Sequence, residues 1–177
     1  NSLPNSMFQS SEAEAQASLE FVDQSTENAL ATGEHRSWNL TLNTNEARAL
    51  PLRLSLVWTD PPGNPSAGIK LVNDLDLIVS NTVSGEIFYG NDFKPDELFT
   101  SVTSTNGVPR LDNVNNVENI YISPPLSTNY VVSVVARRVN VNSVNDHPDG
   151  VVQDFALVIS SGDNPAVEAP FKLEPIE

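Results

Sequence analysis

Acidic and amide side chains gather in three short stretches of the chain. Residues 73–76 read Asn-Asp-Leu-Asp inside an apolar run, residues 90–93 read Gly-Asn-Asp-Phe, and residues 115–119 read Asn-Asn-Val-Glu-Asn. Carboxylate, amide and backbone oxygens are the ligands that Ca²⁺ takes in proteins, about six to eight at a time. Three such stretches in one small domain therefore favour a site for a hard cation.

Asp74 and Asp76 are the centre of this pattern, because they alternate with Leu75, Leu77 and Val79. In a β-strand the apolar side chains would then face the core, and both carboxylates would lie on the other face, about 7 Å apart. Two carboxylates at that distance repel each other unless a positive charge lies between them. The alternative is a solvated strand face, because charged residues are common on exposed faces.

The second and third stretches are expected at the ends of neighbouring strands. Asn91 and Asp92 form the second cluster, and the third consists of Asp112, Asn115, Asn116 and Glu118. Plain turns are the alternative for the amide-rich segments, because Asn and Asp bond to their own backbone there. His147, in a polar loop between Asp146 and Asp149, is expected to be a surface histidine or to join those two around an ion.

Catalytic interpretations have less support in the residues. A glycosidase pair built from Asp92 and Glu118 is an alternative, but the separation that decides that chemistry is not fixed by the sequence. The Asp-Leu-Asp triplet also occurs in sugar-nucleotide transferases, which need an α/β fold that this chain does not predict. Neither His35 nor His147 has a nucleophile motif nearby. The glycosylation pattern Asn39-Leu40-Thr41 falls inside a predicted strand and is attributed to chance.

Period-two alternation dominates the chain from residue 37 onward. Turn-forming clusters such as Pro-Pro-Gly-Asn-Pro at 61–65 and Ser-Pro-Pro at 123–125 separate the alternating runs. The predicted strands cover residues 38–42, 52–58, 74–80, 86–90, 117–122, 129–137 and 153–160. The fold class expected is all-β, an antiparallel β-sandwich or jelly-roll-like barrel of about eight strands.

The two ends of the chain are predicted to lie outside this domain. Residues 1–36 are expected to form a non-β connecting segment with a possible short helix at 11–21, because Ser11 precedes two glutamates as a cap would. Residues 37–162 form the predicted sandwich, and 163–177 read as an acidic, proline-containing tail or linker. The start Asn-Ser-Leu-Pro favours an excised or mature portion of a longer protein.

Composition limits the classes of partner. Nine basic and 23 acidic residues give a formal charge of −14, which disfavours nucleic acid and anionic membrane surfaces. The absence of cysteine excludes disulfides and thiolate metal sites. Trp38 and Trp58 share their faces with leucines and are predicted to lie in the core, which leaves few aromatic groups for stacking on a sugar.

Five motifs in order resemble the C-terminal β-barrel domain of subtilisin-like serine proteases of the large alkaline type. The resemblance covers about residues 21–160, and its motifs read LSLVWTDPP at 54–62, LVNDLDL at 71–77, GNDF at 90–93, NNVEN at 115–119 and YVVSV at 130–134. The sequence departs from the family between Lys94 and Arg110, where its loop is longer.

This resemblance implies a P-domain-like jelly roll that follows a protease catalytic domain and binds structural Ca²⁺. The positions that match the family's acidic motifs, and hence the metal ligands expected, are Asp74, Asp76, Asn91, Asp92, Asp112, Asn116 and Glu118. The resemblance also implies a secreted, extracellular parent, whose own catalytic domain is the partner. The isolated domain is expected to be a monomer.

The subtilisin Asp, His and Ser motifs are not found in this sequence, so the chain alone is expected not to hydrolyse peptides. The alternative function is a free-standing, calcium-dependent carbohydrate- or surface-binding module.

Overall fold

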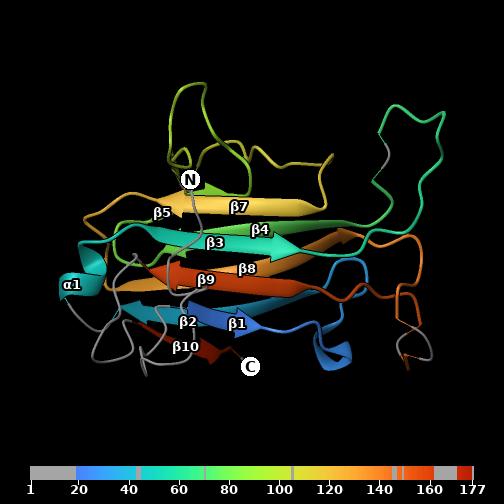
Figure 1. The fold of residues 1–177 in the computed structure, drawn as a ribbon, viewed down its shortest axis with the longest axis horizontal. Coiled ribbons are helices and arrows are strands. Elements are labelled where there is room, and N and C mark those ends of the chain that lie inside the picture. The colour runs from blue at the N-terminus through green and yellow to red at the C-terminus, as the bar shows by residue number, and fades with distance from the viewer. Residues whose placement is uncertain are drawn as a thin grey trace, which may run out of the picture.

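A computed structural model describes residues 19–42, 45–69, 71–104, 106–144, 147–148, 150–161 and 171–176. Its described strands form two antiparallel sheets that pack face to face (Figure 1). The predicted all-β sandwich is therefore confirmed.

The smaller sheet has four strands in the order β1-β9-β3-β7. Its members are β1 (Leu19–Val22), β9 (Ala156–Ser161), β3 (Leu52–Val57) and β7 (Val117–Ile122). The larger sheet has six strands in the order β10-β2-β8-β4-β5-β6. Its members are β10 (Phe171–Pro175), β2 (His35–Leu42), β8 (Asn129–Arg138), β4 (Asp74–Asn81), β5 (Glu86–Tyr89) and β6 (Thr103–Ser104).

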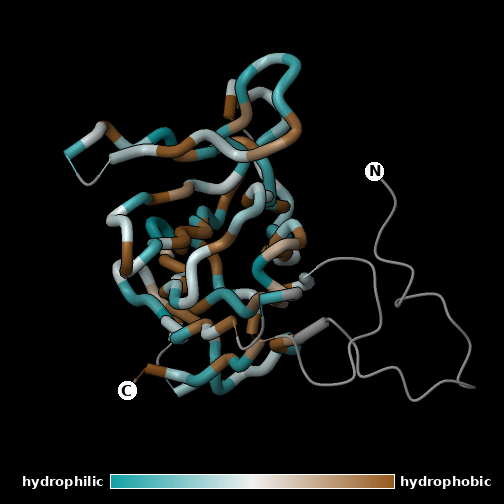
Figure 2. The backbone as a smooth tube through the Cα atoms, turned by 90° about the vertical axis from the view of Figure 1, so that its left-hand side faces the viewer, coloured by the Kyte–Doolittle hydropathy of each residue, from teal (hydrophilic) through white to brown (hydrophobic). Residues whose placement is uncertain are grey.

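Alternating side chains fill the space between the sheets. From β3, Leu54 and Leu56 are fully buried, and they belong to the same core cluster as Leu75 and Leu77 of β4. In Figure 2, where the backbone is coloured by hydropathy, many hydrophobic segments accordingly lie in the interior of the domain. Both tryptophans lie in this core, as their strand parity predicted.

The ends of the chain differ from the sequence-based expectation. Residues 19–21, assigned to a possible helix, form β1, which pairs with β9; the rest of that predicted helix lies outside the described residues. Residues 171–175, assigned to a tail, form β10, which pairs with β2. Prolines flank the period-two pattern Phe-Lys-Leu-Glu and favour a linker, yet a proline at the end of an edge strand breaks no ladder.

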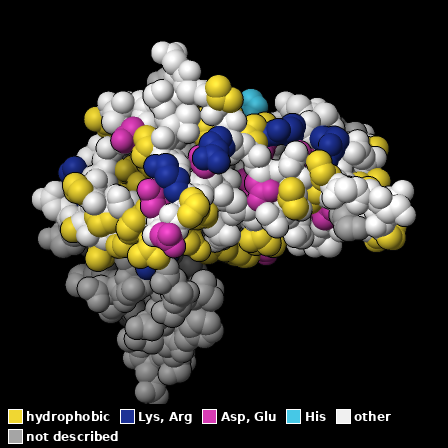
Figure 3. Space-filling model, turned by 90° about the horizontal axis from the view of Figure 1, so that it is seen from above, with side chains coloured by type: hydrophobic (Ala, Val, Ile, Leu, Met, Phe, Trp, Pro, Cys, Tyr) yellow, Lys and Arg dark blue, Asp and Glu magenta, His cyan; other side chains and the backbone are white. Residues whose placement is uncertain are grey.

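Short helical turns complete the fold. A 3₁₀ turn, η2 (Thr26–Asn28), is capped by Ser25 and precedes β2, and a single α-helical turn, α1 (Asn45–Arg48), follows β2. None of the helices in the described ranges is long and apolar enough to cross a membrane. On the face shown in Figure 3, Lys and Arg side chains lie beside Asp and Glu side chains.

The two edges of β4 are paired over different lengths. β8 pairs with β4 from Asp74 to Asn81 on one side, whereas β5 pairs on the other side only at Ile78, Val79 and Ser80. The first half of β4 therefore has no paired strand on that side, where the Leu77 carbonyl accepts from Gly90 N at 3.0 Å.

Candidate metal centre

Asp74 and Asp76 lie on β4 with only 1% and 3% of their surface exposed. They have the parity opposite to Leu75 and Leu77, as the sequence predicted, but this face is covered rather than solvated. Burial raises the pKa of both carboxyl groups, and the neighbouring arginines oppose this effect only in part. A solvated strand face therefore does not describe these two residues.

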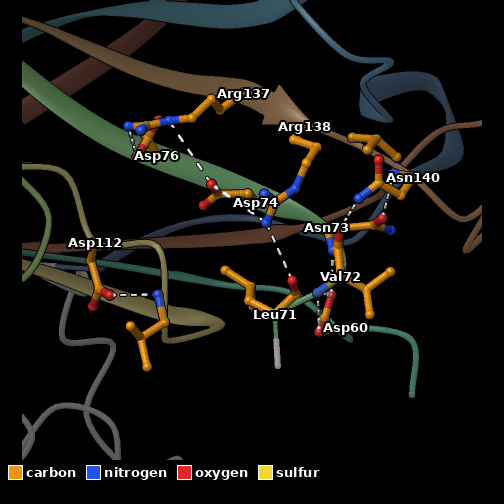
Figure 4. A network of polar contacts seen from close by, with 12 residues as sticks. Asp60, Leu71, Val72, Asn73, Asp74, Asp76, Asp112, Arg137, Arg138 and Asn140 are labelled. Atoms are coloured by element: carbon orange, nitrogen blue, oxygen red, sulfur yellow. Dashed lines mark hydrogen bonds and ion pairs between the residues drawn. The ribbon is translucent and has the colours of Figure 1, made fainter. Parts of the chain in front are cut away.

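The start of β4 is fixed by a network of two buried amide side chains and one half-buried carboxylate. Asp60 accepts hydrogen bonds from the backbone N–H groups of Val72 and Asn73, at 3.0 Å and 2.7 Å. The side chain of Asn73 donates to Gln153 Oε1 at 2.8 Å and accepts from the backbone N–H of Asn140 at 2.9 Å. This network holds the backbone that carries Asp74 (Figure 4).

Two arginines of β8 face these carboxylates. The register of β8 against β4 shifts between Asp74 and Leu75, so that Arg137 is the extra residue of a β-bulge. Its Nε and Nη2 both donate to Asp76 Oδ2 at 2.9 Å, and Nη2 also reaches Oδ1 at 3.0 Å. Arg137 Nε and Arg138 Nη2 each lie 4.0 Å from Asp74 Oδ2 (Figure 4).

Glu118 reaches the same place from the opposite sheet. It shares its parity on β7 with Ile120 and Ile122 and is 1% exposed. Its Oε2 accepts a hydrogen bond from Leu77 N at 2.5 Å and so replaces a strand at the free edge of β4. Burial, with repulsion from the nearby aspartates, raises the pKa of Glu118 to about 9.

Gly90 makes room for the Glu118 side chain. A Cβ atom on Gly90 would lie 2.1 Å from Glu118 Oε2 and 2.8 Å from its Cβ, far inside van der Waals contact. The glycine of the Gly-Asn-Asp-Phe motif is thus required by a close approach.

Asn91 and Asp112 connect the loop before β7 to this cluster. Asn91 has a left-handed backbone (φ 58°), and its Nδ2 donates to Asp112 Oδ2 at 2.6 Å and to the Val117 carbonyl at 2.8 Å. Burial would raise the pKa of Asp112, but hydrogen bonds from Asn115, Asn91 and the backbone outweigh it and lower that pKa. The turn alternative is thus correct for Asn91, whose side chain nevertheless points to Asp112.

The remaining two predicted ligands have other partners. Asp92 is 6% exposed, and its Oδ1 lies 3.3 Å from Nη1 of Arg110. Asn116 is exposed, and its Nδ2 donates to the Trp58 carbonyl at 2.9 Å. Asp74, Asp76 and Asp112 all lie close enough to Glu118 to repel it, and Asn91 is attached through Asp112.

Two oxygens of this cluster are buried without any hydrogen-bond partner, namely Asp74 Oδ1 and Glu118 Oε1. A buried polar atom without a partner is costly and rare in native proteins. Within the described parts of the chain, no group of three Asp, Glu or His side chains is arranged so that it could hold a metal ion as it stands. The donor set of hard oxygens fits Ca²⁺, provided that these side chains rotate toward it.

Sequence reasoning missed Arg137 and Arg138 as members of the site. The only signal available was the parity of Arg137, which places it on the same side of its strand as Val131, Ser133 and Val135. This parity points to the acidic residues only once β8 is known to pair with β4, and the sequence alone does not show that pairing.

The other candidate groups lie elsewhere. His35 is exposed, and His147 Nε2 lies 3.0 Å from the Thr26 carbonyl oxygen, whereas Asp146 and Asp149 are outside the described residues. Both tryptophans are buried, which removes them as a platform for sugar rings.

The fold and the site together define a β-sandwich domain with buried carboxyl groups near a sheet edge. Comparison of the sequence with known proteins adds relatives to this description. No family model matches the chain. Three proteins of Dictyostelium discoideum match about half of it: the serine protease/ABC transporter B family proteins tagD (37% identical over 103 residues), tagB (35% over 88) and tagA (33% over 105). The matched regions cover 55%, 49% and 58% of this chain but only 6%, 4% and 5% of the relatives.

Among solved structures, one similar chain is CorA, a surface-associated copper-binding protein of Methylomicrobium album BG8. It is 13% identical, with 81% of this chain and 79% of that chain covered, and its TM-score is 0.21. That likeness is too low to bear on fold or function.

Proposed function

We propose that this chain is a non-catalytic accessory domain of a subtilisin-like serine protease, and that it binds Ca²⁺ as a structural ion. The observation that carries the ion site is the pair of buried, unpartnered oxygens, Asp74 Oδ1 and Glu118 Oε1, within a cluster of four carboxyl groups. The ligands proposed are Asp74, Asp76, Asp112 and Glu118, whereas the side-chain oxygen of Asn91 accepts a hydrogen bond from Asn119 N at 3.0 Å.

Charge is the main argument for a cation. Burial is the main cause of the raised pKa of Glu118, and repulsion from Asp76, Asp112 and Asp74 raises it further. A divalent ion would offset this repulsion and satisfy the two oxygens that lack partners. The flexible, high-coordination geometry of Ca²⁺ suits a mixed set of carboxylate and amide oxygens better than the strict octahedron of Mg²⁺ does.

The relatives support the link to a protease. Their names contain the words serine protease, and the chain spans about one twentieth of their length. The five motifs that resemble the C-terminal barrel of subtilisin-like enzymes point to the same class. In this proposal the partner is the catalytic domain of the same polypeptide, and the parent works outside the cell, where Ca²⁺ is abundant.

Thermal unfolding of the chain with Ca²⁺, with Mg²⁺ and with chelator tests the ion site. Ca²⁺ at about a hundredfold above its Kd stabilises the fold by about 2.7 kcal/mol, which raises the Tm by roughly 5 to 10 °C for a domain of this size. Mg²⁺ is expected to give a smaller shift.

The paired substitution Asp74→Asn with Asp76→Asn should abolish the calcium-dependent shift. Asp96→Asn is the matched control, because Asp96 is exposed in the loop after Asp92, and it should leave the shift intact. A wild-type Tm that does not respond to Ca²⁺ would overturn the ion site. A parent gene without an upstream serine protease triad would overturn the accessory role.

A further inference from the structure

Arg137 occupies the position in which a cation would neutralise Asp76. Its guanidinium contacts both carboxylate oxygens of Asp76 at 2.9 to 3.0 Å. The planar fork of an arginine matches a carboxylate in this geometry. A metal ion that takes Asp76 as a ligand needs the same lone pairs, and its positive charge would repel the guanidinium.

The surroundings of Arg137 allow it to leave. Its side chain is 38% exposed, whereas the side chains of Asp74 and Asp76 are 2% and 4% exposed. An arginine with its head group near the surface can swing into water while its aliphatic stem stays on the sheet. Asp74 and Asp76, by contrast, are buried on β4.

Arg137 does not satisfy the cluster. Asp74 Oδ1 and Glu118 Oε1 have no partner although the guanidinium is present, and Nε of Arg138 is likewise buried without one. Arg137 thus neutralises Asp76, but Asp74 Oδ1 and Glu118 Oε1 stay available to another positive group.

We propose that Arg137 is an internal counter-ion that competes with the bound cation for Asp76 and thereby sets the affinity of the site. In the ion-free protein the guanidinium stabilises the carboxylates. Binding of the ion displaces it to solvent, so part of the binding free energy is spent on breaking the Arg137–Asp76 pair. This inference rests on the proposed calcium site.

Calcium titration of the whole chain by calorimetry, compared with the Arg137→Met variant, tests the competition. Removing the competitor should tighten the calcium Kd about tenfold or more, and Arg137→Lys, which keeps the charge but not the fork, should give an intermediate value. Lys172→Met is the control, because it removes one positive charge from β10, three strands from β4, and its Kd should equal that of the wild type.

A spectroscopic readout follows the displacement in the wild-type protein. The Nε–H resonance of Arg137 should lose its protection from exchange with water when Ca²⁺ is added. Arg48 is the internal reference, because its Nε donates to the Leu126 carbonyl at 2.8 Å and should keep its protection. A protected Arg137 signal in the calcium-bound state would overturn the inference, even if Arg137→Met failed to fold.

The outcomes separate the two proposals. Equal Kd values for the wild type and Arg137→Met leave the calcium site standing and refute the competition. Binding by Arg137→Met alone would show that the wild-type chain holds no ion, which overturns the calcium site and the role of Arg137 together. If neither protein binds Ca²⁺, the proposed site fails, and the role of Arg137 fails with it.

Discussion

Individual residues of the candidate site are constrained by close contacts as much as by charge. Glu118 illustrates this, because its carboxyl group accepts from Leu77 N and its stem passes directly over Gly90. On β7 it shares the buried face with Ile120 and Ile122. The sequence could therefore predict a buried acid, but not that the acid would replace a strand at the edge of β4.

Substitution of Gly90 by alanine should destabilise the fold by about 1 to 3 kcal/mol, because the new methyl group would overlap the Glu118 side chain. The midpoint of urea unfolding measures the loss. Gly68→Ala is the matched control, because nothing lies within 4 Å of a Cβ at Gly68. An equal effect of the two substitutions would show that the contact with Glu118 has no energetic weight.

At the scale of strands, the most informative element is the bulge in β8. It inserts Arg137 between the partners of Asp74 and Leu75 and so aims the guanidinium at the acidic face of β4. Uniform alternation in the sequence predicts the strand but cannot show a bulge, because the extra residue is defined by pairing with another strand. The two terminal strands were missed for a related reason: β1 and β10 are short edge strands, and their partners β9 and β2 lie far away in sequence.

The strand β10 should contribute measurably to stability. Phe171 is 6% exposed and belongs to the main core, so Phe171→Ala should cost about 3 kcal/mol in urea unfolding. Ile176→Ala, at a position 43% exposed just beyond β10, should change the free energy by less than about 0.5 kcal/mol. A negligible effect of Phe171→Ala would show that residues 171–175 do not stabilise the fold, as expected of a linker.

For the molecule as a whole, the fold changes the acidity of the chain because it buries Asp74, Asp76 and Glu118 and so raises their pKa values. The formal charge of −14 predicted a preference for cations only in general terms. The core and seven of the strands were predictable from alternation, because each predicted run has its own period-two pattern. The burial of Asp74 and Asp76 was not, because it arises when β4, β7 and the loop carrying Asp112 come together.

Chelator-treated protein should lose stability as the pH rises from about 5 to about 9. Folding raises the pKa of Glu118 from 4.5 to about 9, so its contribution is fully present below 4.5 and is lost as the pH climbs through the folded value. The raised pKa values of Asp74 and Asp76 act in the same direction, whereas the lowered pKa of Asp112 removes stability in acid.

Urea midpoints measured across this pH range check the slope. Glu118→Gln should flatten it, while Glu97→Gln, at an exposed position paired with Lys94, should reproduce the wild-type profile. A wild-type stability that rises between pH 5 and 9 would contradict the buried, protonated state of Glu118.

The early end of β5 has one more consequence. It leaves backbone groups of β4 without a strand beside them, and an uncovered edge of this kind is where two protein molecules can join by pairing strands. Glu118 places its carboxyl group on Leu77 N, where an incoming strand would have to dock. One of the residues proposed to hold an ion therefore also disfavours edge-to-edge aggregation of the domain.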